Sequence, residues 1–281
     1  MAWRLLHCLR NGCASGPSVN EPIGPTVNKP MRLRSARIAI LALLCATCAS
    51  VAAESALKIS NATDAAQAGM VDMQSLVPDF RVDMRYAGTN NFVGTRITGY
   101  EAPRCYLLRP VAEALQRVER RLRQQHLRLQ TFDCYRPVRA VQHFVRWAGD
   151  LADQRTKARF YPRLDKRVLL GEYIASTSGH SRGATLDLTM LECDAADRNC
   201  KPLDMGTDFD FFDVRAHTDA PDITPLQQRN RQRLREAMQR EGFENYAQEW
   251  WHYTLQPEPT PGVAYDFVVT APTRHRSNSD S

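Results

Sequence analysis

Two short polar segments lie far apart in this chain of 281 residues. Their side chains suggest a single site, which can form only if the fold brings the two segments together. Residues 178–187 contain His180 and Asp187, and residues 249–252 end at His252. Two imidazoles and one carboxylate form a three-ligand zinc set, which leaves a coordination position open for catalysis, whereas structural zinc sites are closed by four protein ligands. The sequence therefore predicts one catalytic Zn²⁺ per chain.

A candidate base accompanies these ligands. Glu249 stands three residues before His252, and a free carboxylate beside a metal site can take up a proton from water and return it. Residues three apart on a regular strand face opposite sides of a sheet. Glu249 and His252 can therefore face one metal only if the strand carries a bulge or if Glu249 lies at its start.

Periodic patterns predict an irregular alternation of strands and helices. The expected strands are residues 77–86, 127–133, 243–255 and the end of a loop-to-strand segment at 178–190. The expected helices are residues 110–123, the segment after Arg136-Pro137, and the segment from a capping box at Thr224 to Gly242. No regular series of strand–helix–strand units appears, which favours an α+β fold: an antiparallel or mixed sheet with helices packed on one side.

The same patterns divide the chain. We expect residues 76–270 to form one catalytic domain, preceded by a loose segment over residues 54–75, which has few bulky apolar side chains, and followed by a disordered tail over residues 271–281.

The N-terminal residues indicate targeting. Residues 38–49 form an apolar run that follows three arginines and precedes a small-residue cleavage signal. Such a run is too short to span a membrane and is typical of a signal peptide. We expect residues 1–30 to be an over-extended start, residues 31–53 to be the signal peptide, and the mature protein to be exported to the periplasm without a membrane span. A lipid anchor through Cys45 or Cys48 is the alternative, although neither follows the usual small-residue pattern.

Charge gives little reason to expect nucleic acid as a partner. The formal net charge is +6, but residues 1–53 contain six of the 37 Lys and Arg and one of the 31 Asp and Glu. The remaining 31 basic and 30 acidic residues leave a net charge of about +1. The mature protein is therefore nearly neutral.

Four of the eight cysteines remain after removal of the signal peptide: Cys105, Cys134, Cys193 and Cys200. An even number in an exported protein predicts disulfides. Cys193 and Cys200 flank a short polar loop and are expected to pair, which leaves Cys105 to pair with Cys134. The alternative is a zinc site built from cysteines, but the spacing contains no C-x-x-C pair.

Further motifs accompany the two polar segments, in one order along the chain. They are Arg85-Tyr86-Ala87-Gly88-Thr89-Asn90-Asn91-Phe92, Tyr135-Arg136-Pro137, residues 178–183, Asp187-Leu188-Thr189, Met205-Gly206-Thr207-Asp208-Phe209-Asp210 and residues 249–252. Over residues 86–253 the chain resembles the D-alanyl-D-alanine dipeptidases, the VanX-type branch of the zinc D,D-peptidases of family M15. One departure is Thr185, where the wider superfamily usually has Ala; this modestly larger residue is not expected to disturb the site.

The resemblance implies a fold and a set of catalytic roles. The fold is that of the zinc D-Ala-D-Ala carboxypeptidases and the hedgehog signalling domain. His180, Asp187 and His252 would be the metal ligands, and Glu249 would be the general base. Arg136 would stabilise the oxyanion that forms when water attacks the peptide carbonyl, because a fixed cation acts most strongly on charge that develops in the transition state.

Four further positions match substrate-binding residues of the family. Asp210 would bind the free ammonium of a dipeptide. The other three are Ser178, which would contact the substrate, and Tyr86 and Tyr100, which would wall the cavity. Plain core packing is the alternative for both tyrosines. Asp208 and Asp213 are expected to face the solvent.

Together these features predict an enzyme that hydrolyses the small D,D-dipeptide D-alanyl-D-alanine to two D-alanines. The first alternative is a D,D-carboxypeptidase or endopeptidase that acts on peptidoglycan stem peptides; it would need an open groove, whereas a dipeptidase needs a closed pocket and an amine anchor such as Asp210. The second alternative is a non-catalytic, zinc-stabilised module that binds the cell wall. Such a module would have no use for Glu249 and Arg136 together.

Overall fold

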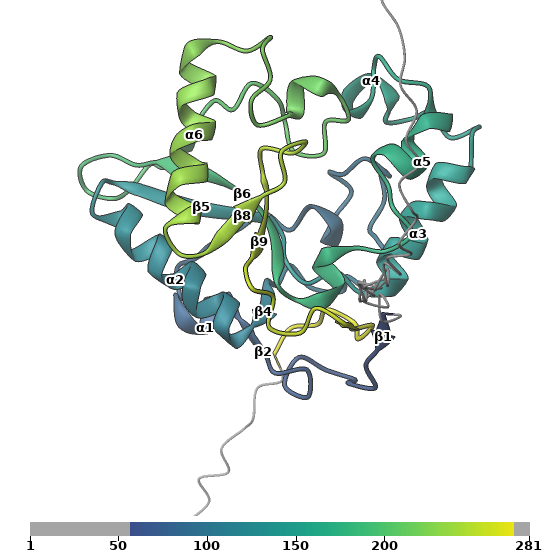
Figure 1. Cartoon of the computed structure of the whole chain (residues 1–281), viewed down its shortest axis with the longest axis horizontal. Coiled ribbons are helices and arrows are strands. Elements are labelled where there is room, and N and C mark those ends of the chain that lie inside the picture. The colour runs from purple at the N-terminus through teal and green to yellow at the C-terminus, as the bar shows by residue number, and fades with distance from the viewer. Residues whose placement is uncertain (1–56, 273–281) are drawn as a thin grey trace, which may run out of the picture. The chain divides into compact units, whose positions relative to one another are not determined.

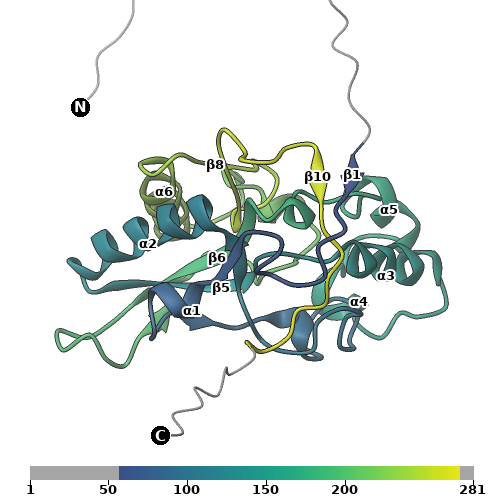
Figure 2. The same ribbon diagram turned by 90° about the horizontal axis from the view of Figure 1, so that it is seen from below.

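The computed structural model describes residues 57–272 (Figures 1 and 2). The predicted over-extended start at 1–30, the predicted signal peptide at 31–53 and nearly all of the predicted tail at 271–281 lie outside these residues. Among the helices of residues 57–272, none has the length and apolar character needed to cross a membrane.

A six-stranded mixed sheet carries the candidate site. Its strands are, in order, β3 (Arg81–Val82), β5 (Leu127–Asp133), β6 (Thr185–Glu192), β9 (His252–Leu255) and β8 (Phe243–Asn245), with β7 (Lys201–Pro202) also paired to β6. β3 and β5 are parallel, and the other pairs are antiparallel. The sheet, with helices packed against it, confirms the predicted α+β class.

The central strand β6 separates the apolar core from the site. Leu186, Leu188 and Met190 are fully buried and alternate with Asp187 and Thr189. Because successive side chains on a strand point to opposite faces, the three apolar residues pack on one side and Asp187 projects from the other. The apolar residues of this strand therefore stabilise the sheet, and its one acidic position on the opposite face is free to bind a ligand.

Two long helices, α2 (Arg109–Arg123) and α6 (Pro225–Gln239), lie side by side against the sheet, where α2 contacts β5 and α6 contacts β8 (Figure 2). Both were expected. Pro110 stands in the first turn of α2, and its predicted apolar stripe is buried. In α6 the Thr224 side chain accepts from the Gln227 backbone N–H, and the Gln227 side chain accepts from the Thr224 backbone N–H, which is the predicted capping box.

A third helix of some length, α3 (Val138–Gly149), follows Arg136-Pro137, as predicted. The other α-helices and strands are short: α1 (Met73–Leu76), α4 (Lys157–Phe160), α5 (Leu169–Glu172), β1 (Lys58–Ile59), β10 (Val263–Ala264), β2 (Met70–Asp72) and β4 (Tyr106–Leu108). Both predicted disulfides, Cys105–Cys134 and Cys193–Cys200, are present.

The expectation of a loose segment over residues 54–75 was wrong for the part that the structure describes. β1 pairs with β10 in parallel, and β2 pairs with β4 in antiparallel fashion. Met70 and Met73 are buried in the core, and Asp72 caps α1 through a bond from the Gln74 N–H. The segment has few bulky apolar side chains in its sequence, which led to the wrong expectation, but its two flexible methionines fill space in the core well.

The last predicted strand is a hairpin rather than one continuous strand. Residues 243–255 form β8 and β9, joined by a loop at residues 246–251. The Asn245 side-chain amide donates to the carbonyl oxygens of Glu249 and His252, at 3.1 and 3.0 Å, and holds the loop closed. The predicted strand over residues 77–86 likewise shortens to β3, followed by a 3₁₀ turn at Arg85–Ala87.

Candidate active site

A cavity of about 280 Å³ opens where the two polar segments meet. Small-molecule sites usually range from ~300 to ~1,000 Å³, so this cavity suits a small ligand. Its polar lining residues include Arg136, Ser178, His180, Asp187, Asp210, Glu249 and His252, and its aromatic walls include Tyr86, Phe92, Phe144, Phe212 and Trp251.

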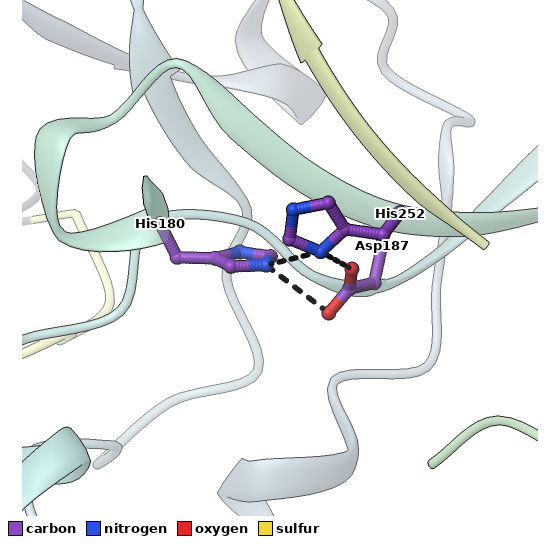
Figure 3. Close-up of side chains that lie close together, drawn as sticks. All are labelled: His180, Asp187 and His252. Atoms are coloured by element: carbon purple, nitrogen blue, oxygen red, sulfur yellow. Dashed lines mark hydrogen bonds and ion pairs between the residues drawn. The ribbon is translucent and has the colours of Figure 1, made fainter. Parts of the chain in front are cut away.

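Three side chains from separate elements converge at one point of this cavity (Figure 3). His180 lies in a 3₁₀ turn at Gly179–Arg182, Asp187 lies in β6, and His252 opens β9 directly opposite Asp187 in the sheet register. His180 Nε2 lies 3.4 Å from His252 Nδ1 and 3.3 Å from Asp187 Oδ2, and His252 Nδ1 lies 3.0 Å from Asp187 Oδ1.

These separations fit a bound metal. Zinc bonds of ~2.0–2.1 Å place neighbouring ligand atoms of a tetrahedral site ~3.3 Å apart. Asp187 Oδ1 is buried and has no hydrogen-bond partner, although His252 Nδ1 is close to it. His180 Nδ1 lies 2.8 Å from the Cys134 carbonyl oxygen, so this nitrogen carries the hydrogen and Nε2 presents its lone pair to the group. One nitrogen or oxygen from each of the three side chains lies within 4.8 Å of the others, a grouping that could hold a metal ion.

Electrostatics within the group favour the deprotonated forms of Asp187 and His180, whereas the pKa of His252, which burial alone would lower, is raised by its interaction with Asp187. Burial alone would raise the pKa of Asp187, but His180 and His252 hold this pKa well below its usual value. Burial lowers the pKa of His180, which favours the neutral imidazole that binds metals. The two ligands are thus poised in the protonation states that a metal requires.

Glu249 lies in the hairpin loop, just before β9 begins. Its Oε2 is 3.4 Å from His252 Nδ1, so both side chains face the same point although they are three residues apart. The loop resolves the conflict with strand alternation, because Glu249 precedes the strand and is not bound by its alternation, whereas a bulge or a position at the strand's start was expected from the sequence. Burial raises the pKa of the Glu249 carboxyl to about 7, which is near the value suited to proton transfer at neutral pH.

Arg136 follows β5 and points its guanidinium into the cavity. Its Nε donates to Asp133 Oδ2 at 2.8 Å, and its plane lies over the Tyr86 and Phe144 rings, with 5.2 Å to each centroid. The Arg136 Nη2 atom is 3.5 Å from Asp187 Oδ2. These contacts fix a positive charge beside the candidate metal ligands His180, Asp187 and His252.

Asp210 forms the other charged wall of the cavity. It is 6% exposed, and it adopts a positive φ of 58°, a conformation that is uncommon outside glycine and is often found at functional sites. The Tyr86 hydroxyl donates to its two oxygens at 2.9 and 3.1 Å, and no residue among 57–272 forms an ion pair with it. Burial, followed by the charge of Asp187, raises the pKa of Asp210 well above its usual range.

Most of the predicted site residues meet in this cavity, but Tyr100 does not line it. Its buried hydroxyl donates to Asp133 Oδ1 at 2.6 Å, which places it behind Arg136, so Tyr86 is the one of the two predicted tyrosines that lines the cavity. Ser178 lies at the rim, where its hydroxyl accepts from the His180 N–H. The expectation that Asp213 faces the solvent was wrong: it is buried and pairs with Arg163 and Arg215.

Sequence reasoning missed Asp133, which is fully buried. It accepts hydrogen bonds from Arg136 and Tyr100 and lies 3.5 Å from His180 Nδ1. A lone Asp at the end of a predicted strand carries no motif, so only its position three residues before Arg136 could have drawn attention to it.

Residues 66–270 match a family model described as D-ala-D-ala dipeptidase, of the peptidase M15 group, and this span includes every cavity residue named above. A D-alanyl-D-alanine dipeptidase of Enterococcus faecium is 38% identical over 204 residues, which cover 72% of this chain and 99% of the relative. The proteins of the same name from Streptomyces coelicolor and Escherichia coli are 39% and 31% identical and are covered over 96% and 97% of their lengths. The residues matched in these two comparisons make up 70% and 74% of this chain, respectively.

Proposed function

Because the chain belongs to the D-Ala-D-Ala dipeptidase family of M15 peptidases, and is therefore an enzyme, we propose that it hydrolyses D-alanyl-D-alanine to two D-alanines with the help of one zinc ion. The single observation that carries the proposal is a buried carboxylate, Asp210, that faces the same small cavity as the metal-binding group and has no cationic partner among the described residues. That carboxylate suits the free ammonium of a dipeptide.

His180, Asp187 and His252 would hold the zinc ion, since their donor atoms have the required identity and spacing. When bound there, zinc supplies Lewis acidity, which polarises a peptide carbonyl and lowers the pKa of water. Three protein ligands leave room for the substrate and the water that attacks it.

Glu249 moves the proton. Its carboxylate lies beside the metal-binding group, where it takes a proton from the attacking water and delivers it to the leaving amine. The burial that raises its pKa suits both steps, because a carboxyl with a pKa of about 7 both accepts and releases a proton readily near neutral pH.

Arg136 stabilises the negative charge on the carbonyl oxygen as water attacks. Its guanidinium is held by Asp133 and by two aromatic rings, so little reorganisation is needed when that charge develops. Of the substrate-contacting candidates, Ser178 lies 3.5 Å from Arg136 Nη1 at the cavity rim, and Tyr86 orients Asp210.

Asp210 favours a dipeptidase over a carboxypeptidase. A carboxypeptidase acting on stem peptides receives an acylated nitrogen at this position, and a buried carboxylate without a partner would then be costly. A free ammonium instead forms a charge-assisted hydrogen bond with it. The limited cavity volume points in the same direction.

We also propose that the protein acts outside the cytoplasm, in the periplasm. The apolar run at residues 38–49 supports export, and two disulfides suit an oxidising compartment.

The proposal is tested with purified protein whose metal content is measured. We expect one zinc per chain, rapid hydrolysis of D-alanyl-D-alanine and little hydrolysis of L-alanyl-L-alanine. Removing the metal with a chelator should abolish activity, and added zinc should restore it, because the open metal site provides the Lewis acid. Full activity after metal removal, or equal rates on the two dipeptides, would contradict the proposal.

A further inference from the structure

The Cys105–Cys134 disulfide lies directly behind the site. Cys105 precedes β4, Cys134 follows β5, and both are fully buried. Cys134 also occupies the centre of the turn that supplies the site, with Asp133 on one side and Arg136 two residues later. The carbonyl oxygen of Cys134 receives the bond from His180 Nδ1, at 2.8 Å.

Sheet pairing alone does not hold this turn in place. The ladder between β5 and β6 is regular up to Thr131 but shifts its register between Thr131 and Asp133. Such irregularities disrupt the ladder locally and re-aim the residues that follow, although pairing resumes here at Asp133 and Asp187. Beyond the shift, the Tyr135 N–H donates to the Tyr106 carbonyl at 3.0 Å and the Arg136 N–H donates to the His180 carbonyl at 3.3 Å. The disulfide is the one covalent attachment of this turn to β4 among the described residues.

We propose that the Cys105–Cys134 disulfide is a positioning crosslink for the metal site: it fixes the Cys134 carbonyl that orients His180, and it fixes the turn that presents Asp133 and Arg136. This inference rests on the proposed metal-binding function. A carbonyl that holds the outer nitrogen of a metal-binding histidine sets both the tautomer and the direction of the ring. Without the crosslink, this carbonyl is held by the surrounding packing and hydrogen bonds alone.

The second disulfide provides a matched control. Cys193 follows β6 at the end away from the site, six residues after Asp187, a distance of about 20 Å along an extended strand. Its partner Cys200 closes a short loop with a sequence separation of 7, and none of this loop lines the cavity. Both disulfides constrain the unfolded chain, so both removals should lower stability, but only one should change the metal site.

The experiment compares the wild-type full chain with two double variants, Cys105→Ala/Cys134→Ala and Cys193→Ala/Cys200→Ala. Zinc affinity is measured by competition with a chromophoric chelator, metal geometry by the absorption spectrum of the cobalt-substituted protein, and folding by circular dichroism. Kinetics on D-alanyl-D-alanine supply kcat and KM separately. The wild-type chain is also measured after reduction and removal of the reductant under anaerobic conditions, which breaks both disulfides and keeps every atom of the cysteine side chains except for the added hydrogens. The Cys193→Ala/Cys200→Ala variant shows how much of the effect comes from the second disulfide.

We expect the variant at residues 105 and 134 to remain folded, to bind zinc at least about 10-fold more weakly, to show an altered cobalt spectrum, and to lose kcat more than it raises KM. The control variant should match the wild type in all of these except stability. The reduced wild type should behave like the variant at residues 105 and 134.

Three outcomes would overturn the inference. The first is an unchanged zinc affinity and cobalt spectrum in folded protein that lacks the crosslink, and the second is equal losses in both double variants. The third is unfolding of both the Cys105→Ala/Cys134→Ala variant and the reduced chain, which would make the bond a requirement of the whole fold. A wild-type chain that binds no metal would instead defeat the proposed function, so the two failures are distinguishable.

Discussion

Replacement of Glu249 by glutamine should lower kcat for D-alanyl-D-alanine by at least about 10²-fold and leave the zinc content unchanged. The amide keeps the size and polarity of the side chain but cannot accept a proton from water, and loss of a general acid or base typically costs ~10²–10⁴-fold. Metal binding should persist because three other side chains form the metal-binding group, without Glu249. Metal analysis and steady-state kinetics on the same preparation test this expectation.

Glu244→Gln is the matched control for this experiment. Glu244 belongs to the same hairpin, in β8, but is exposed and does not line the cavity. The Glu244→Gln substitution should leave kcat unchanged. If Glu249→Gln loses zinc together with activity, Glu249 is a ligand and the division of roles is wrong.

Asp210→Asn should reduce kcat/KM for D-alanyl-D-alanine by about 30-fold to several-thousand-fold. Truncating one partner of a buried charge pair typically costs ~2–5 kcal/mol, and each ~1.4 kcal/mol corresponds to a factor of ten. Asparagine can still accept from the Tyr86 hydroxyl, so the wall of the cavity should keep its shape and the loss should report the charge. Steady-state kinetics with the free dipeptide measure it.

The control for Asp210 is its neighbour Asp208, which lies on the surface and pairs with Arg85 and Arg159. Asp208→Asn should leave kcat/KM unchanged, because surface ion pairs of this kind contribute little. Equal, small effects of the two substitutions would remove Asp210 from the substrate-binding role.

Local signals explain what the sequence predicted well. The apolar stripe and Pro110 define α2, alternation over residues 127–133 defines β5, and Thr224 with Gln227 defines the start of α6. Each depends on neighbours within a few residues, where periodicity and capping operate.

The three candidate metal ligands were predicted from their residue types, but their geometry depends on strand pairing. Asp187 and His252 face each other because β6 and β9 are adjacent and in register. The hairpin loop that carries Glu249 could not be distinguished from a continuous strand, because Asn245 closes it through hydrogen bonds to residues four and seven positions later, and a lone Asn carries no such signal.

Long-range contacts account for the remaining differences. The strand β1 exists because β10 pairs with it from the other end of the domain, and Asp213 is buried because Arg163 reaches it. Asp133 holds Arg136 in the site because Tyr100, Arg136 and His180 surround its carboxylate. None of these partners is close enough in sequence to Asp133 to form a recognisable motif, except Arg136.

The most direct test of the dipeptidase assignment is to block the substrate's amine. We expect wild-type kcat/KM to be at least about 30-fold higher for D-alanyl-D-alanine than for N-acetyl-D-alanyl-D-alanine, because acetylation leaves Asp210 buried without its cation and adds bulk in a small cavity. A pentapeptide that ends in D-alanyl-D-alanine should be a poor substrate for the same reasons. Comparable kcat/KM values for the free and acylated substrates would contradict the account and indicate a D,D-carboxypeptidase instead.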